Sequence, residues 1–153
     1  MAEGLAGLRI YQLAEALADE MWDEVVRWKP FARDTVGRQL VEAADSVGGN
    51  IAEGYGRYHY KDNRLFQFYA RGSLEETGHW LRRARHRMLL SEARYEDFIR
   101  KVSELAPQLN AYIRTLERKA KQERTSSSPT VARATPFQVL TSSQISSASF
   151  SAS

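Results

Sequence analysis

The chain has 153 residues, and its 22 Lys and Arg residues exceed its 19 Asp and Glu residues, which gives a net charge of +3. It contains no cysteine, so disulfides, thiolate metal sites and cysteine nucleophiles are excluded. Apolar residues make up 42% of the chain, enough for one hydrophobic core and one domain. No apolar run approaches the roughly 20 residues that span a bilayer, and no signal segment is recognisable, so we expect a cytoplasmic protein without membrane contact.

The first predicted helix covers residues 8–29. Its apolar residues recur at steps of three and four, which places them on one helix face. Pro30 is expected to end it. Residues 19–24 are rich in carboxylates, and like charges four residues apart destabilise a helix unless basic groups lie opposite.

The second predicted helix covers residues 34–53, with Asp34 as its N-cap. Three of its residues are glycines, each costing about 1 kcal/mol against alanine in a helix interior. Their presence suggests a close approach to a neighbouring helix backbone. These glycines are Gly37, Gly48 and Gly49, and Gly54 and Gly56 then mark the helix end.

The third predicted helix, residues 60–90, is the longest. One stripe of this helix is expected to face the core, and basic residues are expected on the opposite side. The core-facing stripe comprises Phe66, Tyr69, Ala70, Ser73, Thr77, Trp80, Leu81, Ala84 and Met88. The opposite stripe comprises Arg64, Arg71, Arg82 and Arg85, with Arg83 and Arg87 beside them.

The fourth predicted helix covers residues 95–121, and Pro107 is expected to kink it. The loops at 30–33, 54–60 and 91–94 are short, which forces neighbouring helices antiparallel. The fold class is therefore predicted as all-α, an antiparallel up-down-up-down four-helix bundle spanning residues 8–121.

Residues 122–153 are predicted to form a disordered tail. From residue 125 onward, 10 of 29 residues are serine and four are threonine, with Arg133 as the single charged residue apart from the chain terminus. Such a composition cannot bury enough apolar surface to offset the entropy of folding.

Charge is unevenly distributed along the sequence. Residues 1–56 have a balance of −5, whereas residues 57–124 have a balance of +7. This separation predicts a basic surface for polyanions, or acidic-to-basic contacts between copies of the chain.

Two separated motifs carry a family resemblance. The segment Ser46-Val47-Gly48-Gly49-Asn50-Ile51-Ala52-Glu53-Gly54-Tyr55-Gly56-Arg57 resembles the signature of four-helix bundle proteins encoded in bacterial 23S ribosomal RNA intervening sequences. A second match follows at Phe66, Phe68 and Ala70-Arg71-Gly72-Ser73-Leu74-Glu75-Glu76. The resemblance covers about residues 8–121.

The resemblance implies a four-helix bundle that assembles as a ring-like homopentamer and has no known catalytic activity or cofactor. Related members are accessory proteins of diversity-generating retroelements, where a basic pentamer contacts nucleic acid and a reverse transcriptase. A comparable role in nucleic-acid binding, with a reverse transcriptase as a further partner, is an expectation that the resemblance raises for this chain.

The polar residues of the two motifs are interpreted as structural. Asn50 and Glu53 would cap or bridge the end of the second helix, and Arg57 would tie the turn by charge-assisted bonds. Small residues in the third helix would admit a neighbouring helix closely. The structural motif set is Asn50, Glu53, Gly54, Gly72, Ser73 and Glu76.

The basic stripe of the third helix is the candidate binding site. Arginines along one face can follow successive phosphates, and Phe68 nearby can stack on an unpaired base. The alternatives are pairing with acidic residues 19–24 of a neighbouring subunit, or a merely solvated surface. The candidate nucleic-acid-binding residues are Arg57, Lys61, Arg64, Arg71, Arg82, Arg83, Arg85 and Arg87.

Two rival functions remain at this point. One is an oligomeric scaffold whose basic face grips an acidic protein partner. The other is a metal-dependent bundle enzyme, since Glu76 and His79 have the Glu-x-x-His spacing of di-iron proteins. Such a centre needs two copies of the motif and two more inward glutamates, and the chain has one copy, so no metal and no catalytic residue is expected.

Overall fold

The computed structural model describes residues 4–127. Four long helices are α1 (Arg9–Val25), α3 (Arg38–Tyr55), α4 (Tyr60–His86) and α5 (Glu92–Ser126). Three short elements accompany them: the 3₁₀ helix η1 (Leu5–Gly7), the single turn α2 (Pro30–Ala32) and the π-helical segment η2 (Arg33–Gly37). The described part of the chain contains no strand, and the prediction of an all-α four-helix fold is confirmed.

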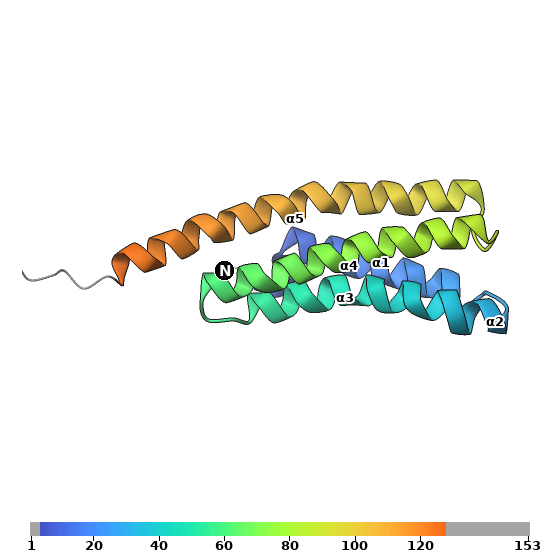
Figure 1. Cartoon of the computed structure of the whole chain (residues 1–153), viewed down its shortest axis with the longest axis horizontal. Helices are drawn as coiled ribbons and strands as arrows, with labels where there is room; N and C mark the ends of the chain where they lie inside the picture. The colour runs from blue at the N-terminus through green and yellow to red at the C-terminus, as the bar shows by residue number, and fades with distance from the viewer. Residues whose placement is uncertain (1–3, 128–153) are drawn as a thin grey trace, which may run out of the picture.

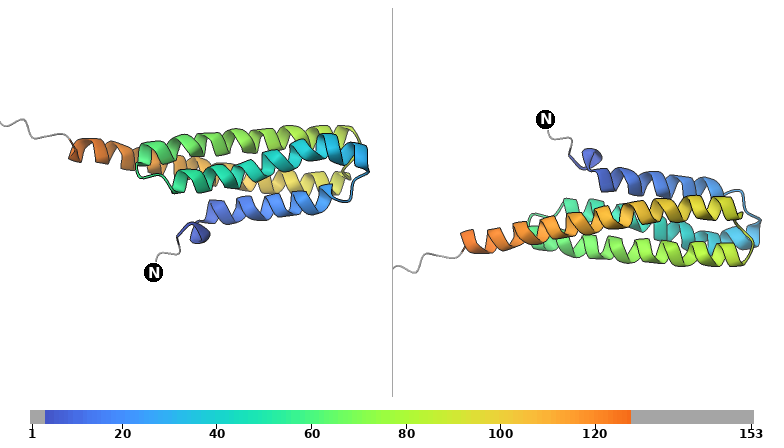
Figure 2. Two further views of the ribbon diagram at one scale, coloured as in Figure 1. Left: turned by 90° about the horizontal axis from the view of Figure 1, so that it is seen from below. Right: turned by 90° about the horizontal axis from the view of Figure 1, so that it is seen from above.

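The four long helices lie side by side as an elongated bundle (Figure 1, Figure 2). The colour gradient of Figure 1 runs in opposite directions along successive long helices, so each connection reverses the chain. α3 packs between α1 and α4, and α5 closes the bundle by contacting both α4 and α1. Within residues 4–127 no helix is both long and apolar enough to cross a membrane.

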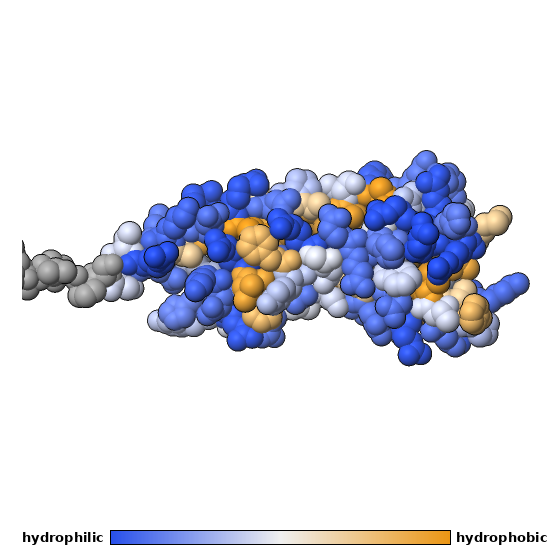
Figure 3. Space-filling view, viewed as in Figure 1, coloured by the Kyte–Doolittle hydropathy of each residue, from blue (hydrophilic) through white to orange (hydrophobic). Residues whose placement is uncertain are grey.

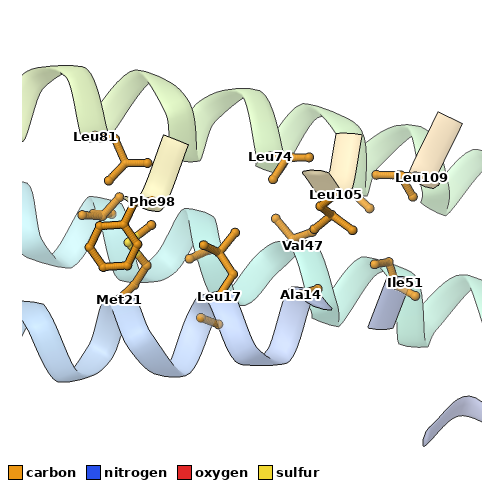
Figure 4. Close-up of a cluster of buried hydrophobic side chains, with 14 of the residues drawn as sticks. Ala14, Leu17, Met21, Val47, Ile51, Leu74, Leu81, Phe98, Leu105 and Leu109 are labelled. Atoms are coloured by element: carbon orange, nitrogen blue, oxygen red, sulfur yellow. The ribbon is translucent and has the colours of Figure 1, made fainter. Parts of the chain in front are cut away.

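The core runs along the bundle axis and is built from all four helices (Figure 4). Met21 of α1, Leu81 of α4 and Phe98 of α5 meet near one end, and each is fully buried. Val47 and Ile51 of α3 continue the core towards the other end. Burying each such side chain contributes about 1.5–3 kcal/mol, which makes this axis the main source of stability.

The first connection differs from the prediction at both of its helix ends. α1 ends at Val25, and Pro30 begins the next helical turn because its fixed φ and missing N–H suit a first helical position. Asp34 is not an N-cap, since it lies inside η2 and accepts a 2.9 Å hydrogen bond from Arg33 Nε. Gly37 does allow a close approach: a Cβ there would lie 2.5 Å from Val25 Cγ1.

α4 and α5 also have different ends from those predicted. α4 ends at His86, and Met88 adopts a positive φ of 61° in the turn. α5 begins at Glu92 because the Ser91 hydroxyl accepts a 3.1 Å hydrogen bond from the Arg94 backbone N–H. Pro107 is accommodated within the continuous helix.

The last helix is longer than its predicted end at residue 121. α5 continues to Ser126, and its last turns extend past the start of α4 (Figure 1). Basic residues at its end, including Lys121 and Arg124, favour continued helix by complementing the helix dipole. The rest of the predicted tail, residues 128–153, lies outside the described residues.

Candidate nucleic-acid interface on α4

α4 turns a different face to the core from the one its aromatic residues predict. Ala70, Thr77, Leu81 and Ala84 of the predicted stripe are buried, but Tyr69 is 50% and Met88 90% exposed. Asn63, Gln67, Leu74 and Gly78 occupy the remaining core positions. The predicted stripe was therefore partly wrong. The true face has the helical spacing 63, 67, 70, 74, which periodicity alone did not single out because two of these residues are polar.

Two buried amides explain why α4 is rotated in this way. Gln67 Nε2 donates to Asn63 Oδ1 at 2.8 Å and lies 3.4 Å from the Ile51 carbonyl oxygen, and Asn63 Nδ2 donates to the Tyr112 hydroxyl at 3.3 Å. A Cβ on Gly54 would lie 2.6 Å from Gln67 Nε2 and 2.9 Å from the Asn63 carbonyl oxygen. The missing side chain of Gly54 thus makes room for a polar seam between α3 and α4. Burial in this seam raises the pKa of the Tyr112 hydroxyl.

The rotation moves three of the predicted stripe arginines beside α5 and away from the opposite side of the helix. Arg85 forms a 2.7 Å ion pair with Glu92. Arg64 lies 3.8 Å from a carboxylate oxygen of Glu117, and Arg71 Nη1 lies 3.5 Å from Asn110 Oδ1. These arginines therefore line the boundary between α4 and α5, where they also help to hold the two helices together.

Guanidinium groups cover aromatic rings at the N-terminal end of α4. Arg57 pairs with Glu53 and lies over the Phe66 ring at 4.6 Å. The Phe68 ring is within 4.9 Å of the Arg71 guanidinium and 5.8 Å of that of Arg64. Phe68 remains 37% exposed, so its predicted position beside the basic residues is confirmed.

Three arginines near the end of α4, two in its last turns and one directly after it, have no acidic partner within residues 4–127. Arg82 and Arg87 are exposed and Arg83 is half-buried. Within residues 4–127 none of the three forms an ion pair, and neither does exposed Lys61 at the other end of the helix. The negative end of the α4 dipole favours cations here, which accounts for their stability without carboxylates.

A groove of about 580 Å³ lies where the start of α4 meets the end of α5. Four cationic side chains and three carboxylates face it, and Glu123 Oε2 accepts a 3.3 Å hydrogen bond from the Tyr60 backbone N–H. The groove is therefore mixed in charge. Its lining residues are His59, Lys61, Asp62, Arg64, Glu117, Ala120, Lys121, Glu123, Arg124 and Ser127.

The family motif residues have mostly structural partners. Asn50 Nδ2 donates to Ser73 Oγ at 3.3 Å, which links α3 to α4, and Ser73 Oγ donates to the Tyr69 carbonyl oxygen at 3.1 Å. Glu76 Oε1 accepts a 3.3 Å hydrogen bond from Trp80 Nε1. Gly72 is the exception. It is exposed, and apart from its own helix backbone no atom lies within 4 Å of the position of a Cβ, so no other helix of this chain approaches it closely.

The acidic segment of α1 is largely used within the same chain. Glu24 Oε2 lies 3.1 Å from Arg94 Nε of α5, and Glu20 pairs with Lys101. Asp19 and Asp23 form no ion pair within residues 4–127. Half of the carboxylates proposed for a neighbouring subunit thus join α1 to α5, and Asp19 and Asp23 remain available.

A family comparison agrees with the two motifs. The model of the 23S rRNA-intervening sequence protein family matches residues 6–111. The chain belongs to this family. The match includes α1, α3, α4 and the first half of α5, so the helices that form the basic surface are family elements.

A solved structure supports the fold. A crystal structure of an S23 ribosomal protein family member of unknown function from Bacteroides thetaiotaomicron is similar to this chain with a TM-score of 0.62 at 17% identity. The similarity covers 68% of this chain and 97% of the other. No protein of curated function is similar enough in sequence to match.

Proposed function

We propose that this 23S rRNA-intervening sequence family protein is a non-enzymatic, oligomeric nucleic-acid-binding bundle. Binding is assigned to the basic residues of α4, and the oligomer to a homopentamer as the family resemblance implies. The observation that carries the proposal is the group of three arginines, Arg82, Arg83 and Arg87, that have no acidic partner among residues 4–127. They lie in the half of the sequence whose charge balance is +7.

Binding of this kind is dominated by the phosphate backbone. Each arginine that neutralises a phosphate releases condensed counterions, so affinity falls as salt rises and depends weakly on base sequence. A single α4 offers few such contacts, and one chain alone would bind weakly. Repetition of the surface around an oligomer raises avidity without new contacts.

The arginines differ in their value for testing the proposal. Reversing the charge of Arg71 or Arg85 would also disturb the boundary between α4 and α5, because both contact α5. Reversing Arg82, Arg83 and Arg87 removes charge without breaking an ion pair of the described chain. The second set therefore disturbs the fold least, since the single chain loses only the favourable interaction of these cations with the α4 dipole.

We expect the triple variant Arg82→Glu, Arg83→Glu, Arg87→Glu to lose at least about tenfold in affinity for a labelled RNA or DNA strand at low salt. The dependence of log affinity on log salt should flatten by about one unit per lost phosphate contact. Fluorescence anisotropy across a salt series measures both quantities.

The matched control reverses three exposed cations outside α4, Lys29, Arg38 and Arg114, which also form no ion pair within residues 4–127 and change the net charge equally. It should retain the affinity and most of the salt slope. If both triple variants lost affinity equally, the loss would be explained by overall charge and not by the position of the arginines. Unchanged binding by the α4 variant would contradict the proposal.

The rival function is a scaffold whose basic face binds an acidic protein, and a reverse transcriptase is the protein partner that the family resemblance suggests. The two functions differ in competition. Binding through phosphates is displaced by bulk nucleic acid, whereas an interface with shape-specific contacts is not. A partner held equally well in excess nucleic acid would favour the scaffold.

A further inference from the structure

One face of α4 near its N-terminus is apolar and is covered by no other helix. Leu65, Phe68 and Tyr69 are 47%, 37% and 50% exposed, and Gly72 follows at helical spacing. In the space-filling view, apolar side chains gather over this half of α4 among hydrophilic neighbours (Figure 3). Exposed apolar surface of this kind on a helix is typical of an interaction site.

The glycine in this face has no use within the chain. Gly72 lies in the middle of α4, where glycine costs about 1 kcal/mol against alanine, and apart from its own helix backbone no atom lies within 4 Å of the position of a Cβ. Gly54 differs, because Gln67 and Asn63 occupy the space that a side chain there would need. The open space at Gly72 suits a backbone from outside the chain.

A groove of complementary character lies between α1 and α3. It has a volume of about 250 Å³, and most of its lining residues are alanines and glycines. Among them is Gly49, where apart from its own helix backbone no atom lies within 4 Å of the position of a Cβ. Three carboxylates, those of Glu15, Asp19 and Asp45, also line it. The lining residues are Tyr11, Ala14, Glu15, Ala18, Asp19, Asp45, Gly48, Gly49 and Ala52.

The charges of the two surfaces are opposite. Arg64 and Arg71 border the apolar face of α4, and both contact α5 only at 3.5 Å or more. Asp19 and Asp45 in the groove form no ion pair within residues 4–127. Burial, with a smaller contribution from the nearby Asp19 carboxylate, raises the pKa of Asp45. The repulsion between two unpaired carboxylates that lie close together decreases when cations approach them.

We propose that the apolar face of α4, formed by Leu65, Phe68, Tyr69 and Gly72, docks into the α1–α3 groove of a second copy of this chain. Gly72 and Gly49 would bring the two helix backbones together, and Arg64 and Arg71 would approach Asp19 and Asp45 of the other copy. The two surfaces of one chain are different, so the contact is head-to-tail and closes into a ring when the rotation permits.

This inference rests on the proposed oligomer and specifies its contact surfaces. It divides α4 into two functional halves. The first half contacts the next copy, whereas Arg82, Arg83 and Arg87 near the end of the helix remain open for polyanions. Each contact then covers two arginines and two aspartates, so assembly leaves the net charge of the free surface unchanged and keeps these three arginines exposed.

The test uses two variants that block one surface each, Gly72→Gln on α4 and Gly49→Gln in the groove. Glutamine is uncharged and favours helix, and both positions have room for a Cβ, so both variants should fold. Each chain alone should lose assembly in light scattering after size exclusion. Ala111→Gln, at an exposed position of α5, is the matched control and should assemble like the parent chain.

Mixing the two blocked variants tests whether the two surfaces bind each other. Each retains one intact surface, so an equal mixture should form particles of two chains and no larger. A mixture that stays monomeric, or a single variant that assembles normally, overturns the pairing of these two surfaces. A parent chain that is monomeric at every concentration would instead contradict the proposed oligomer, while binding by Arg82, Arg83 and Arg87 is read separately by anisotropy.

Discussion

The two sides of α3 use the same residue type for opposite purposes. On the side facing α4, Gly54 is buried, and the space of its missing side chain is filled by Gln67 and Asn63. On the side facing α1, Gly49 is exposed, and nothing fills the corresponding space. The first glycine is required by the fold of one chain. The second is a cost to that fold, and such a cost points to a requirement outside it.

Substitution at Gly54 should have the largest effect. Gly54→Ala places a methyl group within 3 Å of two side-chain atoms and one backbone oxygen. The side chains can move, but the Asn63 carbonyl oxygen is fixed by α4, so overpacking should lower the free energy of unfolding by about 2 kcal/mol. Urea denaturation followed by circular dichroism measures this. An unchanged midpoint would show that α3 and α4 separate easily at this point.

Gly49→Ala on the same helix should act in the opposite direction. The new methyl group meets no atom, and the helix gains propensity, so the free energy of unfolding of the single chain should rise by up to about 1 kcal/mol. The same denaturation experiment, carried out on dilute protein, compares the two alanines directly. Destabilisation at Gly49 would mean that α3 needs glycine here for its own packing.

A smaller effect is expected at Asp45, which lines the open side. Burial and the Asp19 carboxylate raise the pKa of Asp45 in the folded chain above its unfolded value. Its charged form therefore opposes folding, and this penalty is absent below the unfolded pKa of about 3.9 and complete once pH exceeds the folded pKa.

Asp45→Asn should consequently raise the melting temperature slightly at neutral pH and leave it unchanged in acid. Melting curves of both chains across pH give the comparison. An identical difference at all pH values would assign the effect to the amide group and not to charge.

The sequence predicted the helices well because each long helix has an apolar period that a bundle requires. It predicted helix ends less well, since the same residue type can act at more than one position of a helix end. Pro30 can end one helix or begin another, and only the extended backbone of Lys29 before it decides for the second. Ser91 was an available N-cap, but the apolar pattern starts later, at Tyr95.

The candidate site was harder to predict because polar residues lie inside the first half of α4 and aromatic residues lie outside it. Because polar residues are normally assigned to the surface, Asn63 and Gln67 were expected to face solvent. The predicted core-facing side of α4 is therefore rotated about the helix axis relative to the observed one. The rotation decides whether Arg64, Arg71 and Arg85 face solvent or α5. Partners distant in sequence, such as Arg94 with Glu24, are also invisible to helical periodicity.

The extension of α5 beyond the bundle has a practical consequence for the length of this protein. Leu116 is its last buried apolar residue, and the helix continues for ten residues to Ser126. Amide protons in these final turns should exchange with solvent much faster than those near Leu109, because opening them exposes no core. Changes beyond Glu123, which accepts a hydrogen bond from the Tyr60 backbone N–H, therefore alter the length of the helix and leave the bundle alone, which makes the end of α5 a suitable place to attach a label or a fused domain.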